Sequence, residues 1–321
     1  MKTFGGYFEL EIGRPREAYH AGRLALCSGR ACLGRIIDEI RPARVHVPFY
    51  ICGSLLVPLR ARGIPLSFYA LTELLEPVEP IDVADGDAVV IVNYFGLKDD
   101  AVRVAARRYR RSAVIDDTHA FFARGYADAW SFNSARKFFG VADGGYAFGP
   151  GLEPDERPRL DRPRYDHLIA RLQGDVAGGY ASYVEAEAAI TAEPLGMSRM
   201  SERLMASIDY QEVVKTRRRN YERVHERFGR RNRLAGALLT LGSQVPYCYP
   251  LLPNLPLPAR ESLWKAGLFI AVLWPDLERR TASFGWERRL AEELLPLPID
   301  QRYGDADIDE LCDCLEKVCN W

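Results

Sequence analysis

The residues best suited to chemistry lie in three short segments of the first half of the chain. The first is SGRAC (28–32), where Ser28, Gly29 and Arg30 form a tight turn between an expected strand and an expected helix. Backbone N–H groups at a helix N-terminus attract anions, and glycine lets a ligand approach closely. Many α/β proteins share this turn, so its interpretation as a phosphate site depends on the other two segments.

The second segment, VIDDTHAF (114–121), combines carboxylates with an imidazole. Asp116 and Asp117 end an apolar run, and His119 follows them closely. If the run is a strand of a parallel sheet, these side chains lie at its carboxyl end, where open α/β sheets bind ligands. The alternative is that the acids only cap the next turn.

The third segment, SFNSARKFFGVADGGYAFG (131–149), places Lys137 in an apolar loop bounded by glycines. Only six of the 43 basic residues are lysines, so a lysine here suggests a task that arginine cannot perform. A lysine with a lowered pKa can form a Schiff base, and the charge of Arg136 is expected to lower the pKa of Lys137. The alternative is an ordinary surface lysine.

Together, the three segments predict a cofactor. Pyridoxal phosphate needs a phosphate cradle, an acid that keeps its pyridine nitrogen protonated and a lysine that holds it covalently. All three kinds of residue occur in that order on one expected α/β lobe. The sequence therefore predicts a pyridoxal-phosphate site.

Hydrophobic patterning predicts the elements that position these residues. Short β-type runs alternate with helical patterns over the first 150 residues, which favours an α/β domain with a mostly parallel sheet. A surface excursion follows at 150–165. The expected strands are residues 23–27, 43–49, 65–70, 87–95, 112–117, 128–134 and 144–149, and the expected helices include 30–40 and 99–110.

The second half of the chain predicts a smaller α+β domain. We expect a large α/β domain over residues 1–205 and a small α+β domain over residues 206–321. The expected elements are one long helical stretch (200–233), two β-type runs (245–252 and 267–274) and a closing helix (305–318).

Composition excludes several other classes of protein. The chain has 321 residues, 48% of them hydrophobic, and a formal net charge of −1, so it lacks a general attraction to nucleic acid or membranes. The basic run 215–233 is interleaved with acids and is interpreted as a solvated helix face. No apolar run reaches the roughly 18 residues of a membrane span, and no secretory signal is recognised, so a cytoplasmic location is expected. Seven scattered cysteines without a CxxC pair predict reduced thiols, with no metal site.

The sequence resembles the DegT/DnrJ/EryC1/StrS family of sugar aminotransferases, which have the aspartate aminotransferase fold (fold type I of the pyridoxal-phosphate enzymes). The resemblance extends over nearly the whole chain and is most specific around Lys137. The matching blocks are GGYFELE (5–11), ALCSGRAC (25–32), VPFYIC (47–52), VIDDTHAF (114–121), NSARKFFGVADGG (133–145), GMSRMSERLMASI (196–208) and LPIDQRYGDADIDEL (297–311).

The resemblance implies a role for each site residue. Lys137 becomes the Schiff-base lysine and the acid/base that moves the substrate's proton. Asp116 pairs with the pyridine N–H, His119 lies near the ring, and Ser134 binds the phosphate together with the turn at the first helix. The expected cofactor-binding residues are Ser28, Gly29, Arg30, Tyr50, Asp116, His119, Ser134 and Lys137.

The chain departs from the family pattern at several positions. Arg30 stands where the family usually has threonine, and Met197, with Ser198 beside it, stands where an asparagine often reaches the neighbouring subunit's phosphate. Cys52 aligns with the aromatic residue that stacks on the ring, and Tyr50 is the alternative. Asp143 replaces the glutamate of the family's GEGG motif.

The resemblance implies a homodimeric aminotransferase that acts in polysaccharide or secondary-metabolite synthesis. Its amino donor is expected to be glutamate or another amino acid, and its acceptor a keto sugar, which some family members bind as a nucleotide derivative. Two alternatives stay open: a pyridoxal-phosphate enzyme of another outcome (a dehydratase or a non-sugar transaminase) and a non-catalytic relative with a binding role. Retention of Lys137 favours transamination over dehydration.

Overall fold

A seven-stranded sheet forms the centre of the larger lobe of the computed structural model, which describes residues 10–13, 16–234, 236–275, 277 and 285–321. Most of the expected block 5–11 lies outside the described residues. The strand order is β1-β7-β6-β5-β4-β2-β3. The strands are β1 (Leu24–Leu26), β2 (Val45–Pro48), β3 (Leu66–Tyr69), β4 (Ala88–Val92), β5 (Ala113–Asp116), β6 (Trp130–Phe132) and β7 (Gly145–Phe148).

The sheet is mostly parallel, as the sequence predicts. Strands β3, β2, β4, β5 and β6 run parallel to one another, whereas β7 is antiparallel to both β6 and β1. Every residue of β4 and β5 is buried, which explains their continuous apolar runs. The carboxyl ends of β1, β2, β4, β5 and β6 therefore meet at one edge of the sheet.

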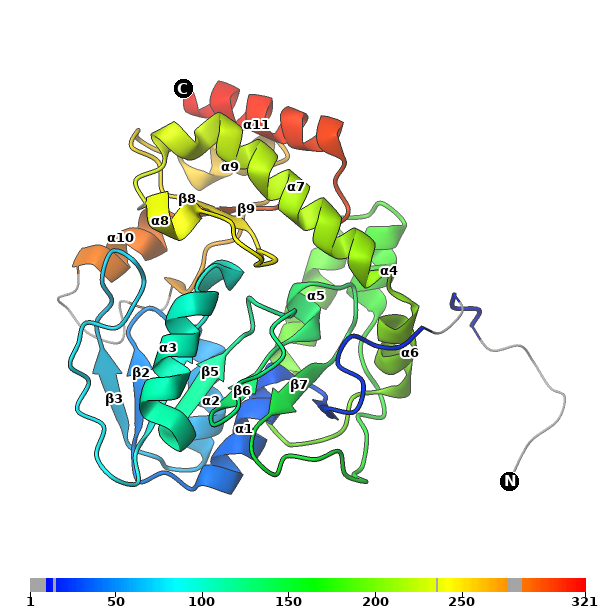
Figure 1. Ribbon diagram of the computed structural model, residues 1–321. Helices are drawn as coiled ribbons and strands as arrows, with labels where there is room; N and C mark the ends of the chain where they lie inside the picture. The colour runs from blue at the N-terminus through cyan, green and yellow to red at the C-terminus, as the bar shows by residue number, and fades with distance from the viewer. Residues whose placement is uncertain (1–9, 14–15, 235, 276, 278–284) are drawn as a thin grey trace, which may run out of the picture.

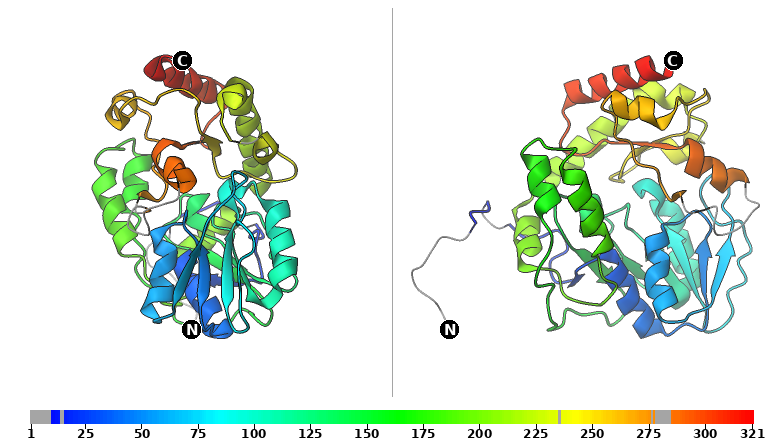
Figure 2. Two further views of the ribbon diagram at one scale, coloured as in Figure 1. Left: turned by 90° about the vertical axis from the view of Figure 1, so that its left-hand side faces the viewer. Right: turned by 180° about the vertical axis from the view of Figure 1, so that it is seen from behind.

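Helices cover both faces of this sheet. Helices α1 (Gly29–Ile40) and α2 (Gly53–Ala61) lie on one face, and α3 (Asp99–Tyr109) lies on the other (Figures 1 and 2). Short 3-10 turns connect several elements; they are η1 (Tyr94–Gly96), η2 (Arg110–Ser112), η3 (Ala135–Lys137) and η4 (Gly229–Arg231). No helix among the described residues is long and apolar enough to cross a membrane.

A pair of helices, α4 (Asp166–Leu172) and α5 (Gly179–Ala188), follows the irregular segment 150–165. The chain after α5 returns to the start of α1. There the Ser28 hydroxyl donates to the Thr191 carbonyl over 2.9 Å, and the Arg30 guanidinium donates to the Ile190 carbonyl over 3.0 Å. These bonds hold the helix pair next to the first turn of α1.

The smaller lobe lies above the carboxyl edge of the sheet in Figure 1. A two-stranded antiparallel sheet lies within it, and α7 and α11 lie side by side on its outer surface. The remaining elements are α6 (Arg199–Ser207), α7 (Tyr210–Phe228), α8 (Gly236–Leu239), β8 (Tyr249–Leu251), α9 (Arg260–Lys265), α10 (Gly285–Glu293), β9 (Leu295–Leu297) and α11 (Asp305–Cys319).

Two sequence predictions in this half are wrong. The single helical stretch 200–233 is two helices, because Ile208 adopts an extended conformation and Asp209 caps α7 by accepting from the Glu212 amide. The run 267–274 is not a strand. Leu268 and Ile270 are buried and Phe269 between them is exposed, as in an edge strand, but among the described residues no strand pairs with this run. Strand β9, which the sequence did not predict, pairs with β8 instead.

The basic run 215–233 is neutralised within the chain. Successive turns of α7 place Arg219, Arg223 and Arg227 opposite acids of α11. The Arg223 guanidinium, for example, donates to the Asp309 carboxylate at 2.6 Å. The exposed face that the sequence predicts is thus a ladder of ion pairs between two helices.

Candidate active site

Lys137 is the last residue of η3, directly after β6, and lies at the carboxyl edge of the sheet. Glycines allow its loop to fold tightly. A Cβ atom on Gly145 would lie 2.6 Å from the Asn133 carbonyl oxygen, and Gly144 has a φ of +128°. The loop is also anchored beyond these glycines, because the Asp143 carboxylate accepts from the Ser198 amide at 2.7 Å and from its hydroxyl at 2.6 Å.

This anchoring uses Met197 and Ser198. Met197 is buried and its methyl group lies where a side chain on Gly144 would go, and Ser198 caps α6 while bonding Asp143. Both residues therefore make contacts within their own chain. The Asp143 carboxylate is buried against the start of α6.

The side chain of Lys137 is exposed to solvent, and its amine lies near several acidic groups of the protein. Burial acts to lower its pKa, but the acidic groups of Tyr247, Cys52, Tyr183 and Glu187 outweigh this effect and the pKa is raised. The expected lowering of the Lys137 pKa is therefore wrong. The Arg136 guanidinium bonds the Glu187 carboxylate.

Asp116 and His119 lie beside Lys137 at the end of β5. The Asp116 carboxyl is buried and accepts from the Thr118 amide at 2.9 Å. Burial raises its pKa, and the charge of Lys137 lowers it in part. Burial and the same charge lower the pKa of His119 to about 3, so its imidazole is neutral at physiological pH.

His119 lies within an aromatic group that the sequence did not predict. Its ring stacks on Tyr247 with ring centres 4.3 Å apart and planes 8° apart, and Trp274 lies parallel at 5.8 Å. Its Nδ1 atom is buried and has no hydrogen-bond partner among the described residues. No local signal marks Tyr247 or Trp274, which reach the site from the smaller lobe.

The turn at α1 packs against the lysine loop, as the sequence predicts. A Cβ atom on Gly29 would lie 3.3 Å from the Asn133 carbonyl oxygen and 3.6 Å from the Cβ of Ser134. The hydroxyl of Ser28 is already used, since it accepts from the Ala31 amide and donates to Thr191. The turn therefore offers the amides of the first helical turn, with Ser134 beside them.

Two arginines and a glutamate adjoin this turn. Arg30 donates to the Ser54 hydroxyl at 3.1 Å and lies 4.0 Å from the Glu187 carboxylate, which also accepts from Arg136. The sequence predicted a ligand role for Arg30 alone. Arg136 and Glu187 were missed, because only the fold brings α5 next to η3.

The two candidates for the ring-stacking residue occupy different places. Tyr50 is fully buried, packs edge-on against Trp274 at 4.4 Å and leaves its hydroxyl without a partner among the described residues. Cys52 directly precedes α2 and lies close enough to Lys137 to affect its pKa. Cys52 is thus on the lysine side of the site, and Tyr50 borders the aromatic group around His119.

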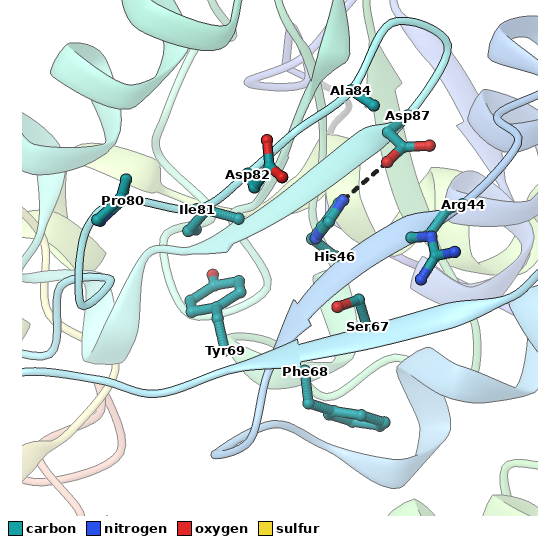
Figure 3. Close-up of a pocket in the computed structure, with 10 residues that line it drawn as sticks. All are labelled: Arg44, His46, Ser67, Phe68, Tyr69, Pro80, Ile81, Asp82, Ala84 and Asp87. Carbon is teal, nitrogen blue, oxygen red and sulfur yellow. Dashed lines mark hydrogen bonds and ion pairs between the residues drawn. The ribbon is translucent and has the colours of Figure 1, made fainter.

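A cavity of about 450 Å³ lies away from these residues (Figure 3). It contains the buried pair His46–Asp87, joined by a 2.9 Å hydrogen bond. Asp87 directly precedes β4, so this pair lies at the amino-terminal edge of the sheet, opposite Asp116. None of the expected site residues lines this cavity.

Several solved structures with a similar fold are aminotransferases. The sugar aminotransferase CalS13 from Micromonospora echinospora is 15% identical, with a TM-score of 0.59 over 92% of this chain and 86% of that chain. The putative sugar aminotransferase Spr1654 from Streptococcus pneumoniae, in its PLP form, is 15% identical, with a TM-score of 0.61 over 94% and 88%. Helicobacter pylori PseC, an aminotransferase of pseudoaminic acid biosynthesis, is 12% identical, with a TM-score of 0.63 over 92% and 86%.

The sequence matches no family model and no curated protein. Identities this low show a shared fold and leave activity open. The expected fold class, an α/β transferase fold with a mostly parallel sheet and a smaller α+β lobe, is confirmed. The chain has the fold of the sugar aminotransferases.

Proposed function

We propose that this protein is a pyridoxal-phosphate-dependent aminotransferase that moves an amino group from an amino acid, expected to be glutamate, to a keto sugar. One observation carries the proposal. The fold gathers Lys137, Asp116 and His119 at one edge of the sheet, next to the anion-attracting turn of α1.

The residues present fit this cofactor. His119 Nδ1 and Arg136 Nε are buried, lie in the segments around Lys137 and have no hydrogen-bond partners among the described residues. Buried nitrogens of this kind are rare unless a ligand or water completes them. A molecule with a ring hydroxyl and a phosphate supplies partners for both.

Each residue then has a task. The cofactor, when bound, supplies an electron-withdrawing ring that stabilises negative charge on the substrate's Cα. Lys137 holds it through its amine and, once free, moves the proton at that Cα. Because burial raises the pKa of Asp116, a cationic N–H beside it is the partner that keeps its carboxylate ionised. His119 stays neutral and packs beside the ring, and Ser134 and the amides of Gly29 and Arg30 bind the phosphate.

The nature of the acceptor rests on the structural neighbours. CalS13 is a sugar aminotransferase and Spr1654 a putative sugar aminotransferase, which supports a keto sugar. The other outcomes, a dehydratase or a non-sugar transaminase, predict no amino transfer to a keto sugar. A binding protein without activity predicts no transfer at all.

We also propose that the protein works as a homodimer. The α4–α5 pair exposes large apolar side chains, among them Leu172 (86% exposed) and Tyr180 (66% exposed). A second copy of the chain would bury this surface. Light scattering should give the mass of a dimer for the wild type and of a monomer for Leu172→Asp combined with Tyr180→Asp; a monomeric wild type would contradict the proposal.

The seven free cysteines support the expectation of a reducing, cytoplasmic environment.

The visible absorption spectrum with added pyridoxal phosphate tests the function. The wild type should develop a visible band that fades when glutamate is added, with release of the keto acid. Lys137→Ala should develop no such band. Lys215→Ala, which removes an exposed lysine of α7, is the matched control and should behave like the wild type. A wild type without the band would refute the proposal.

A further inference from the structure

A cluster of charged side chains lies between three segments that are far apart in the sequence. It consists of Arg30 in the first turn of α1, Arg136 in η3 and Glu187 near the end of α5. The Glu187 carboxylate is shared: one oxygen accepts from Arg136, and the other lies 4.0 Å from Arg30. The arginine side chains are only 18% and 13% exposed, respectively.

Positive charge exceeds negative charge in this cluster. Lys137 directly follows Arg136 and is close enough to Glu187 for its pKa to be affected. Because Lys137 also lies beside the Asp116 carboxylate, the two arginines share the single carboxylate of Glu187, which leaves an excess of one positive charge. His167 of α4 adds no charge, because burial and then the charge of Arg136 lower its pKa. An excess of largely buried positive charge is costly unless an anion offsets it.

The cluster also has unused hydrogen-bond donors. Arg136 Nε is buried without a partner among the described residues, although one of its terminal nitrogens bonds Glu187. The amides of the first turn of α1 lie beside the lysine loop, where Gly29 packs on Asn133 and Ser134. A phosphate monoester carries a charge near −2 and several strong acceptor oxygens, so it matches both the charge and the donors.

We propose, resting on the proposed function, that Arg136 and Arg30 bind the cofactor's phosphate from within one chain, and that Glu187 is the counter-ion which this phosphate displaces. Met197 is buried and the Ser198 hydroxyl donates to Asp143 of the same chain, so the proposal uses no phosphate contact from either residue. A phosphate outcompetes a carboxylate here because it offers more charge and more acceptor atoms to two guanidinium groups.

Replacing an arginine of the cluster and replacing its glutamate should change the affinity for phosphate in opposite directions. Arg136→Gln removes a charged donor and should weaken binding of phosphate monoesters on the order of 10- to 100-fold. Glu187→Gln removes the competitor and should tighten binding several-fold. A gain of affinity cannot arise from a poorly folded variant, so the second change guards against misreading the first.

The test measures dissociation constants of the full-length protein for three probes: inorganic phosphate by calorimetry, and pyridoxal phosphate and pyridoxal by absorbance. We expect Arg136→Gln to weaken both phosphate-containing probes and to leave pyridoxal, which lacks the phosphate, unchanged. Arg35→Gln and Glu39→Gln are the matched controls. They break an ion pair of 2.7 Å on the same helix, away from the site, and should change none of the three constants.

Two results would overturn the inference: unchanged phosphate affinity in Arg136→Gln, or weaker phosphate affinity in Glu187→Gln. The experiment also separates this inference from the proposed function. If inorganic phosphate follows the predicted pattern while pyridoxal phosphate gives no visible band, the phosphate site stands and the aminotransferase proposal fails. If the visible band forms but neither variant changes the affinity for phosphate, the aminotransferase proposal stands and the phosphate-site inference fails.

Discussion

Arg217 of α7 is a buried cation that joins the smaller lobe to the lysine loop, and its removal should destabilise the fold. Its side chain is 1% exposed. The guanidinium donates to the Gln301 side chain at 3.0 Å and to the carbonyls of Pro246 and Tyr247 at 3.2 and 3.1 Å. It also donates to the carbonyl of Phe138, the residue after Lys137, at 3.4 Å and lies over the Phe138 ring at 4.4 Å.

The expected effect of Arg217→Met is the balance of two terms. The three hydrogen bonds of 3.0, 3.1 and 3.2 Å come from a charged donor and contribute about 1.5–3 kcal/mol each, roughly 4–9 kcal/mol in all. Burial lowers the pKa of Arg217 to about 10 from 12.5, which corresponds to a cost of about 3 kcal/mol that methionine avoids. The free energy of unfolding should therefore fall by roughly 1–6 kcal/mol.

Urea unfolding followed by circular dichroism measures this loss. Lys215→Met, on the same helix but with an exposed side chain, is the control and should unfold like the wild type. Arg217→Lys keeps the charge but loses the planar fork, so its stability should lie between those of the wild type and Arg217→Met. If Arg217→Met is as stable as the wild type, these contacts do not join the lobes as described.

Three further predictions concern the site, pH and salt. Asp116→Asn should slow amino transfer from glutamate on the order of 100-fold or more in single-turnover assays, because an amide cannot carry the charge opposite the ring nitrogen. Burial lowers the pKa of His20 from 6.5 to about 4, so its neutral form favours the fold and this stability is lost as pH falls from about 6.5 towards 4; chemical unfolding of His20→Gln should show a weaker pH dependence in that window, and an unchanged slope would contradict this. Asp309→Asn breaks one rung of the α7–α11 ladder and should lower the melting temperature at low salt, with a smaller difference at high salt; an effect independent of salt would argue against an ion pair.

The sequence predicts the strands of the seven-stranded sheet and the positions of Lys137 and Asp116 at its edge well, because both depend on local patterns. A continuous apolar run such as β5 is buried on both faces wherever it pairs, and the residue that ends it lies at the sheet edge. The break between α6 and α7 also has a local signal. Asp209 precedes Glu212 by three residues, which is the spacing of a helix start.

Other features depend on contacts that no local pattern specifies. Residues 268–270 alternate between buried and exposed like a strand, yet among the described residues β8 pairs with β9 and no strand pairs with this run. Glu187, Tyr247 and Trp274 approach Lys137 or His119 from segments 50 or more residues away. Arg136 was expected to act on its sequence neighbour Lys137, but the contact that decides its role comes from α5.

Identifying the lysine that carries the cofactor tests the central claim most directly. The protein is incubated with pyridoxal phosphate, reduced with borohydride to fix the cofactor on its lysine, digested, and examined by mass spectrometry. The chain has only six lysines, so each is readily told apart. We predict the modification on the peptide that contains Lys137, and its loss when glutamate is added before the reduction. Modification spread over exposed lysines such as Lys215, or unaffected by glutamate, would contradict the assignment of this site.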